Sequence, residues 1–278
     1  YAGVRTFGYY LSSQLVAIKK ERPSMQLRDH VCVVIGAGSG IGRETALMLA
    51  DEGAVPILIG RTATKLSDVK NEILRQGGHS RIFDLDVGDH SAVQDMAETV
   101  LEEFGRVDLL VNNAGHSSPN RRLLTSTPSE IQSVLSSNLL GTIFCTQAVI
   151  PSMLKAQRGT IINIASVAGV NPSLLAGLAY SAAKAAVINF TGFLNKDLEN
   201  TGIRSSVVIP GEVDTPILDN RPTPPSRDAR DTMVTAEDTA NAILMIVKLP
   251  QRANIPELQI RPTYVRDLSA EIESASNS

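Results

Sequence analysis

Short apolar runs alternate with longer helical segments along most of this 278-residue chain, and this order narrows the possible folds. The runs are rich in Val and Ile, which favour strands, whereas the segments between them carry the apolar spacing of helices. Strands that are apolar on both sides are typical of parallel sheets covered on both faces. The sequence therefore predicts an α/β fold, a doubly wound parallel sheet of about seven strands with helices on both faces. Such sheets bind their ligands at the carboxyl ends of the strands.

The expected elements end where the apolar patterns meet Gly, Pro or Asn. Strands are expected at residues 31–35, 55–59, 82–85, 109–111, 160–164, 206–209 and 258–260. Helices are expected at residues 41–51, 63–76, 91–104, 128–155, 179–200 and 236–248. Pro151 is expected to kink or split the fourth of these helices, because proline lacks a backbone N–H.

No linker, repeat or low-complexity tract interrupts residues 31–260. We therefore expect one domain of Rossmann type over residues 30–278, preceded by an N-terminal extension at residues 1–29. Within this domain, residues 217–231 are rich in Pro and in charged residues. They predict a mobile substrate lid at about residues 216–232, which would close on cofactor and substrate. A disordered surface excursion is the alternative.

The composition favours a small-molecule enzyme over several other classes. The net charge is −3 and charged residues make up 20%, so no strong field attracts nucleic acid. No stretch of 18 apolar residues is present, so no integral membrane segment is expected. Cys32 and Cys145 lie in apolar surroundings and are expected to be buried free thiols. The four His residues show no metal-ligand spacing. We expect a cytoplasmic protein that uses no metal.

Four glycines follow the first expected strand and open the first expected helix, in the sequence GAGSGIG at residues 36–42. Glycine allows a tight turn and the close approach of a phosphate, and the first helical turn offers it free N–H groups. The spacing G-x-x-x-G-x-G indicates a dinucleotide site, and a turn that serves packing alone is the alternative. The predicted cofactor contacts in this loop are Gly36, Gly38, Ser39, Gly40, Ile41 and Gly42.

Arg61 follows the second expected strand, where NAD-selective enzymes usually place an acidic residue. Its planar guanidinium suits the 2′-phosphate of NADP, and a charge-assisted contact of this kind is worth roughly 1.5–3 kcal/mol. The sequence therefore predicts that NADP(H) is preferred over NAD(H). A solvated arginine at a strand end is the alternative.

Tyr180 and Lys184 lie four residues apart in an expected helix and therefore share one face. A free tyrosine has a pKa near 10, and a nearby ammonium lowers it towards the range useful for proton transfer. Tyr180 is thus a candidate general acid/base, and Lys184 a candidate donor to the cofactor ribose. Such a pair alone is commonly a surface pair. Ser166, at the end of another expected strand, supports catalysis because its hydroxyl can bind the substrate oxygen.

Asn138 interrupts an expected helix and is the fourth candidate catalytic residue. An exposed Asn of no special function is the common alternative. In this chain its amide is a candidate to bind an ordered water behind Lys184. This water would relay protons from solvent.

Together these motifs resemble the short-chain dehydrogenase/reductase family in its shorter, single-domain form. The resemblance covers about residues 31–260 and rests on the combined set rather than on any one motif. The matching residues are 36–42, Asp86, 112–115, Asn138, Ser166, Tyr180, Lys184, Pro210 and Gly211. Two positions depart from the family pattern: Ile35 replaces the usual Thr before the first glycine, and Glu212 stands where smaller or apolar residues are common.

The resemblance implies further cofactor contacts and a quaternary structure. Asp86 and Val87 would hold the adenine, and residues 113–115 would line the ribose. The residues expected around the ribose and nicotinamide are Asn113, Ala114, Gly115, Pro210, Gly211, Val213 and Thr215. Family members also suggest a homotetramer, or a dimer, in which helices 128–155 and 179–200 pack across subunits.

The sequence thus predicts an NADP-dependent oxidoreductase, of carbonyl reductase type, that acts on a small carbonyl or alcohol substrate. Two alternatives remain: an NAD-linked alcohol dehydrogenase of the same family, and a non-catalytic NADP-binding regulatory protein. Arg221 or Arg227, in the expected lid, is a candidate partner for an acidic substrate. His116 is expected to lie at the pocket edge.

Overall fold

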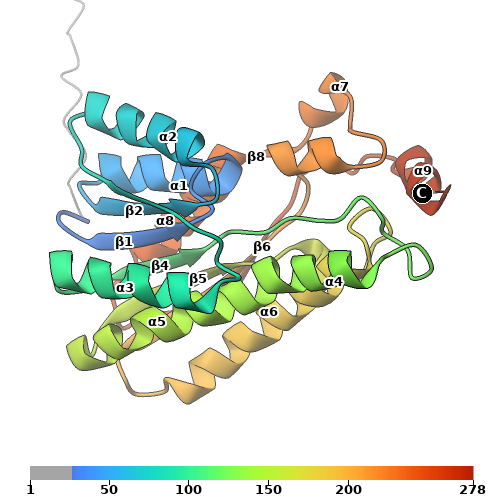
Figure 1. Ribbon diagram of the computed structural model, residues 1–278. Coiled ribbons are helices and arrows are strands. Elements are labelled where there is room, and N and C mark those ends of the chain that lie inside the picture. The colour runs from blue at the N-terminus through green and yellow to red at the C-terminus, as the bar shows by residue number, and fades with distance from the viewer. Residues whose placement is uncertain (1–26, 278) are drawn as a thin grey trace, which may run out of the picture.

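A sheet of seven parallel strands forms the centre of the computed structural model, which describes residues 27–277 (Figure 1). The strands are β1 (Val31–Ile35), β2 (Val55–Gly60), β3 (Arg81–Asp84), β4 (Leu109–Asn112), β5 (Gly159–Ile164), β6 (Ile203–Pro210) and β9 (Glu257–Ile260). They confirm the expected strands within three residues at each end. The predicted N-terminal extension lies mostly outside the described residues; Leu27, near its end, is already buried in the core.

The strand order, β3-β2-β1-β4-β5-β6-β9, is that of a doubly wound sheet. From β1 the chain first adds strands on one side and then crosses to β4 on the other side. Ile35, the last residue of β1, therefore pairs with Ile59 of β2 and with Asn112 of β4. A crevice forms at the carboxyl ends of strands where the order reverses, and this is where such sheets bind ligands.

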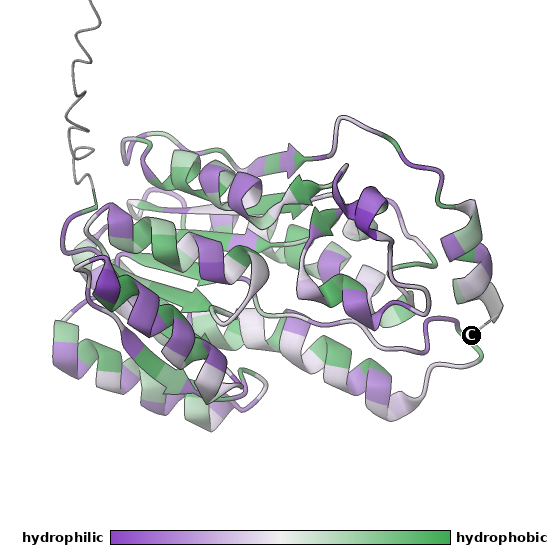
Figure 2. Cartoon of the chain, turned by 90° about the horizontal axis from the view of Figure 1, so that it is seen from above, coloured by the Kyte–Doolittle hydropathy of each residue, from purple (hydrophilic) through white to green (hydrophobic). Residues whose placement is uncertain are grey.

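Helices cover both faces of the sheet, as expected (Figure 1). One layer contains α1 (Gly40–Asp51), α2 (Ala63–Arg75) and α8 (Ala236–Val247), and the other contains α3 (His90–Phe104), α5 (Gly141–Ala156) and α6 (Leu178–Asp197). Adjacent strand residues point to opposite layers: Val34 and Leu58 lie in one apolar core, and Val33 and Ile57 in the other. Figure 2 shows the consequence, hydrophobic strands between helices whose outer sides are hydrophilic.

The long helical run at residues 128–156 differs from its prediction. It consists of α4 (Pro128–Leu135), a wider π-helical turn (Ser136–Leu140) and α5. Pro151 lies inside α5 and does not end it, so of the expected kink or split the structure excludes the split. The irregular turn lies instead at Asn138, whose side-chain amide donates to Val134 O at 2.9 Å and so competes with the regular backbone pattern.

The same run, Pro128–Ala156, is long and apolar enough to cross a membrane by length and composition. It contains no 18 consecutive apolar residues, because polar residues are interspersed. Half of its most apolar window is buried inside the molecule, where α5 packs on α3 and α4 on α6. A buried core helix of this kind accounts for the composition.

Several short elements near the C-terminus were not predicted. Two-residue strands β7 (Val213–Asp214) and β8 (Val234–Thr235) pair with each other, and they flank a 3-10 helix (Pro216–Asn220) and α7 (Arg227–Arg230). A last helix, α9, spans Ser269–Asn277. Figure 1 shows α7 and α9 at the right, away from the helices that cover the sheet. The expected lid therefore contains regular structure.

Candidate active site

One cavity of about 620 Å³ brings most of the predicted site residues together. It lies at the carboxyl ends of the strands and extends from the glycine loop to α6. The predicted residues that line it are Gly36, Gly38, Ser39, Gly40, Ile41, Arg61, Asp86, Val87, Asn113, Ala114, Gly115, Ser166, Tyr180, Lys184, Pro210, Gly211, Val213 and Thr215. Gly42 and Asn138 are not part of the lining and stand behind it.

The glycine positions of this loop leave little room for a side chain. Gly36 has a φ of +74°, which favours glycine, and a Cβ on Gly42 would come within 2.3 Å of Gly36 O. Ser39, the residue before α1, makes no side-chain cap, so the first N–H groups of the helix stay available. These groups and the helix dipole form an anion site that fits a pyrophosphate.

Arg61 and Asp86 face each other at the far end of the cavity. Arg61 Nη1 lies 3.9 Å from Asp86 Oδ2, and both side chains are more than half exposed. A long contact at the surface holds neither group firmly. The Arg61 guanidinium therefore remains free to turn towards a phosphate on a bound nucleotide.

Tyr180, Lys184 and Ser166 form the inner wall. Ser166 follows β5, and its hydroxyl accepts a hydrogen bond from Ala168 N at 3.2 Å. Lys184 is buried, and its Nζ donates to Ile164 O at 2.8 Å and lies 5.6 Å from the centre of the Tyr180 ring. Two helix residues and one strand-end residue thus meet around one point, as the spacing predicted.

Burial and neighbouring charges act in opposite directions on the pKa of Tyr180. Burial raises this pKa most strongly, whereas a hydrogen bond with Ser166 and the positive charges of Arg121 and Arg221 lower it. Burial also lowers the pKa of Lys184 to about 8. The sequence prediction considered only Lys184 as the source of positive charge and overlooked the two arginines.

Asn138 is fully buried, and its amide group is held by donation to His116 O and Val134 O, both at 2.9 Å. Its Oδ1 has no hydrogen-bond partner among residues 27–277. A Cβ on Gly115 would lie 2.4 Å from this oxygen and 3.4 Å from Lys184 Nζ, so both groups face the same glycine. The amide oxygen is therefore an available acceptor next to Lys184.

The comparisons with known proteins show the family of the chain. The family model for short chain dehydrogenases matches residues 30–225. An uncharacterized oxidoreductase of Staphylococcus aureus is 34% identical over 236 residues, which are 85% of this chain and 98% of that protein. The chain belongs to the short-chain dehydrogenase family.

Solved structures of similar proteins have the same fold. A metagenomic short-chain oxidoreductase in complex with NADP is 32% identical, with a TM-score of 0.75 over 86% of this chain and 100% of that one. A closed form of serine dehydrogenase complexed with NADP+ is 30% identical, with a TM-score of 0.77 over 84% of this chain and 94% of the other.

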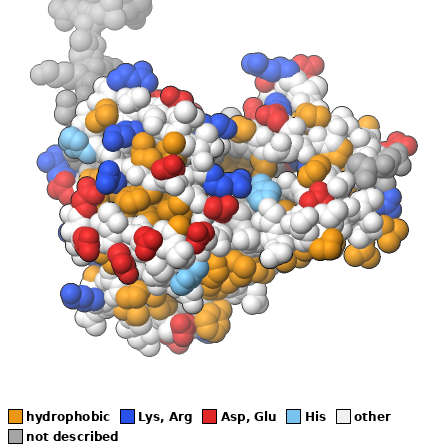
Figure 3. All heavy atoms as spheres, viewed as in Figure 1, with side chains coloured by type: hydrophobic (Ala, Val, Ile, Leu, Met, Phe, Trp, Pro, Cys, Tyr) orange, Lys and Arg blue, Asp and Glu red, His pale blue; other side chains and the backbone are white. Residues whose placement is uncertain are grey.

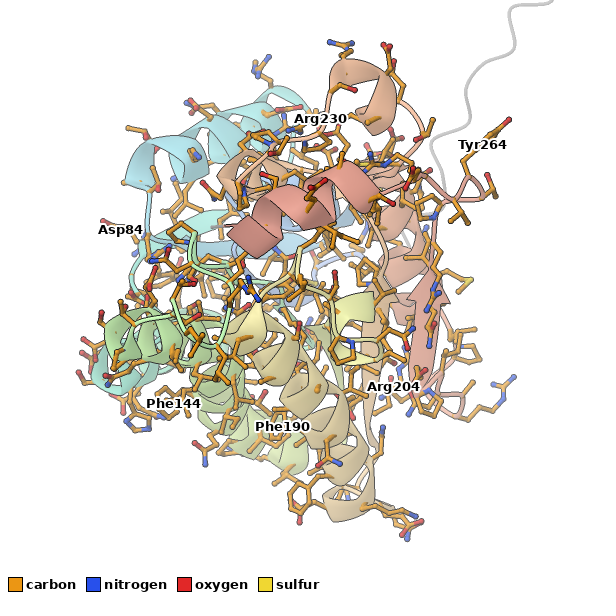
Figure 4. The ribbon with its side chains drawn as sticks, turned by 90° about the vertical axis from the view of Figure 1, so that its right-hand side faces the viewer. Asp84, Phe144, Phe190, Arg204, Arg230 and Tyr264 are labelled. Atoms are coloured by element: carbon orange, nitrogen blue, oxygen red, sulfur yellow. The ribbon has the colours of Figure 1, made fainter. Side chains whose placement is uncertain are left out.

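The segment expected to form a lid, residues 216–232, is tied down by ion pairs. Arg221 and Arg266 both bind Glu212 and Glu271, at N–O distances from 2.8 to 3.1 Å. We call these four residues the lid network. Arg230, the last residue of α7, pairs with Asp214 and Asp219 (Figure 4).

The lid network changes the meaning of two predicted residues. Glu212, which departs from the family pattern, lines the cavity and neutralises two arginines. Arg221, a candidate for binding an acidic substrate, is itself matched by two carboxylates. Arg227, the other candidate, is 90% exposed, does not line the cavity and pairs with Asp231 at 3.8 Å.

His116 lines the cavity and is half-buried, as expected for a pocket-edge side chain. Its ring nitrogens lie 2.9 Å from Ser137 Oγ and 3.2 Å from Ser133 Oγ, which fixes the ring against the helical run. Burial and the charge of Arg61 lower its pKa. The ring is therefore neutral at physiological pH.

Arg121 is the functional candidate that sequence reasoning missed. It lines the cavity from the loop between β4 and α4, yet only 3% of it is exposed. This loop has no apolar periodicity, so nothing local indicated that an arginine there is buried. The residue is buried by a neighbour from another segment: a Cβ on Gly177 would come 3.1 Å from Arg121 Cγ.

Proposed function

We propose that this short-chain dehydrogenase transfers a hydride between NADP(H) and the carbonyl or secondary alcohol carbon of a small substrate, with Tyr180 as general acid/base. One observation carries the proposal: the side chains of Tyr180, Ser166 and Lys184 share a cavity with a glycine-built helix N-terminus. A protein that only binds a nucleotide has no need to place a tyrosine and a serine at this point.

The residues present fit NADP, which supplies or accepts the hydride when it is bound. The glycine loop and the start of α1 would hold the pyrophosphate, and Arg61 would bind the 2′-phosphate. Asp86 and Val87 would hold the adenine. The other contacts, around the ribose and nicotinamide, would be Asn113, Ala114, Gly115, Tyr180, Lys184, Pro210, Gly211, Val213 and Thr215. The NADP named for two solved relatives supports this cofactor over NAD.

The acid/base step would belong to three side chains. During reduction, the Tyr180 hydroxyl gives its proton to the substrate oxygen while the Ser166 hydroxyl donates a hydrogen bond to that oxygen. Lys184 stabilises the tyrosinate that results. The free Oδ1 of Asn138 would hold a water next to Lys184, through which the proton is replaced from solvent. In the oxidation direction each transfer is reversed.

The proposal is tested by initial rates of NADPH and NADH oxidation with a panel of ketones, aldehydes and oxo acids. We expect turnover with NADPH and a lower kcat/KM with NADH. Preference for NADH would instead support the NAD-linked alcohol dehydrogenase. Binding of both cofactors without any turnover would support the regulatory alternative.

Tyr180→Phe should reduce kcat by about 100-fold or more, because general acid catalysis contributes about this factor or more. Cofactor affinity, measured by NADPH fluorescence, should change little, since the phenyl ring keeps its packing. Retained turnover in this variant would exclude Tyr180 as the proton donor.

We further infer that the protein is cytoplasmic and forms a homotetramer or dimer through α5 and α6. Cys32 and Cys145 are both buried and free, which suits a reducing compartment. Leu154 of α5 and Phe193 of α6 are exposed hydrophobic side chains. On the face shown in Figure 3, basic and acidic side chains are interspersed.

A further inference from the structure

Arg121 carries a charge that the protein itself does not neutralise. Only 3% of the residue is exposed, and it borders the same cavity as Tyr180. Its Nη2 donates to Asn220 O at 3.0 Å, but its Nε has no hydrogen-bond partner among residues 27–277. Within the same residues, no carboxylate forms an ion pair with it. A buried charge without a counter-charge is costly to the folded protein.

Two other arginines show how this chain satisfies a guanidinium when the role is structural. Arg204, labelled in Figure 4, is 4% exposed and donates to five backbone carbonyls between Ile246 and Ala253 and to Thr160. Arg221 borders the cavity but is matched by Glu212 and Glu271. Arg121 has one backbone acceptor, Asn220 O, and no carboxylate partner among residues 27–277, so its place is not explained by packing alone.

The surroundings of Arg121 add to its positive potential. Burial lowers the pKa of Arg121 most, and the nearby charge of Arg221 lowers it further, to about 10. Arg121 remains protonated at neutral pH. Its charge in turn acts on Tyr180. The uncompensated cation and the proposed acid/base therefore lie near each other in one cavity.

We propose that Arg121 binds a carboxylate of the substrate, so that the substrate class is a small hydroxy acid or oxo acid. This inference rests on the proposed function, because it assumes that the carbon oxidised or reduced lies at Tyr180. A guanidinium offers parallel N–H donors that match the two oxygens of a carboxylate. The carboxylate stays chemically unchanged while the neighbouring carbonyl gains a hydride at carbon and a proton at oxygen.

The lining of the cavity also contains apolar side chains, among them Leu175, Leu218 and Leu268. They suit the short carbon chain of a molecule whose anionic end is bound by Arg121. A neutral ketone would fill the same space but leave Arg121 uncompensated, which is the basis for discrimination.

The test compares 2-, 3- and 4-oxo acids of four to six carbons with their methyl esters, with NADPH as cofactor. We expect the native enzyme to prefer one acid over its ester by about 10- to 100-fold in kcat/KM. Arg121→Met should lose the preference for the acid over its ester, whereas the loss of its charge near Tyr180 should change kcat/KM for both substrates alike. Arg227→Met is the matched control, because Arg227 lies outside the cavity, and it should keep the preference for the acid.

Thermal midpoints and NADPH affinity show whether Arg121→Met is folded. If it is not, Arg121→Lys decides instead, since it keeps the charge and should retain part of the preference. Equal kcat/KM for acid and ester in the native enzyme would overturn the inference and leave the proposed function standing. An equal loss of kcat/KM for acid and ester in Arg121→Met would also overturn the inference and leave the proposed function standing.

Binding decides the inference if no substrate turns over, which would count against the proposed function. Butanoate, butanamide and butylphosphonate are titrated calorimetrically into the native enzyme saturated with NADP+. We expect butanoate to bind and butanamide not to bind, with the butanoate signal lost in Arg121→Met. Tighter binding of butylphosphonate, or no difference between butanoate and butanamide, would overturn the carboxylate assignment.

Discussion

Lys184 shows at the residue scale how burial sets the chemistry of the site. Its ammonium donates to Ile164 O, its one acceptor among residues 27–277, and only 4% of the residue is exposed. Burial favours the neutral amine, so the pKa falls to about 8. The charge that Lys184 would offer to Tyr180 and to the cofactor therefore varies near physiological pH.

This shift predicts how stability depends on pH. Between about pH 8 and the ordinary lysine pKa near 10.5, the unfolded chain keeps the Lys184 proton that the folded chain has lost. The unfolded state thus binds more protons, and the stability of the folded state rises with pH in this window. Relative to Lys184→Met, the native free energy of unfolding should increase by roughly 1 kcal/mol per pH unit there. Urea titrations at pH 7.5, 8.5 and 9.5 measure this difference, and parallel pH profiles would contradict it.

Arg61 gives a second prediction at the same scale. Because its guanidinium is held only by a long contact with Asp86, it should reorient towards a 2′-phosphate at little cost. Arg61→Ala should weaken NADPH binding by about 10- to 100-fold, as expected for a charge-assisted hydrogen bond, and NADH binding much less. Fluorescence titration with both cofactors measures the effect. An equal loss for NADPH and NADH would show that Arg61 does not read the phosphate.

Residues that follow a strand or share a helix face were predictable, whereas a residue buried by a distant loop was not. Tyr180 and Lys184 share a face through helical periodicity alone, and Ser166 reaches them because it follows a parallel strand. Arg121 depends on contacts with Gly177 and Asn220, 56 and 99 positions away in the chain. Sequence spacing carries no information about such loop contacts.

At the scale of elements, the lid network joins three segments that the sequence separates. Glu212 lies before the lid, Arg221 within it, Arg266 before α9 and Glu271 on α9. All four side chains are at most 20% exposed, so solvent screens their attraction only weakly. The network therefore holds the lid against α9.

Glu271→Gln should loosen the lid, because it leaves two arginines with one carboxylate between them. Proteolytic cleavage within residues 216–232 should become roughly tenfold faster, since one charged hydrogen bond fewer makes local opening easier. Glu273→Gln, an exposed position on the same helix, is the control and should leave the rate unchanged. If both variants are cleaved at the native rate, α9 does not restrain the lid.

Long elements were easier to predict than short ones. The seven strands and the helices on the sheet were found within three residues, because burial on one or both sides imposes a clear pattern. β7, β8 and α7 have two to four residues each, too few to show any period. The break at Asn138 was noticed as an irregularity, but its π-helical form comes from tertiary contacts of the amide.

The scale of the whole molecule concerns how copies of the chain associate. Phe193 is 60% exposed on α6, the helix that also carries Tyr180 and Lys184. If α5 and α6 pack across subunits, Phe193→Asp should reduce the mass in solution, because a charge would be buried in an apolar contact. Leu74→Asp, an exposed position on α2, is the control. Light scattering coupled to gel filtration measures both variants, and an unchanged mass for Phe193→Asp would exclude this interface.

The lid network also has a practical consequence for handling the protein. Glu271 lies on α9 and pairs with Arg221, so a label or crosslink placed on α9 would strain this contact. The substrate entrance would then respond to a change made on a helix outside the sheet. Kinetic constants are best compared between preparations in which α9 is unaltered.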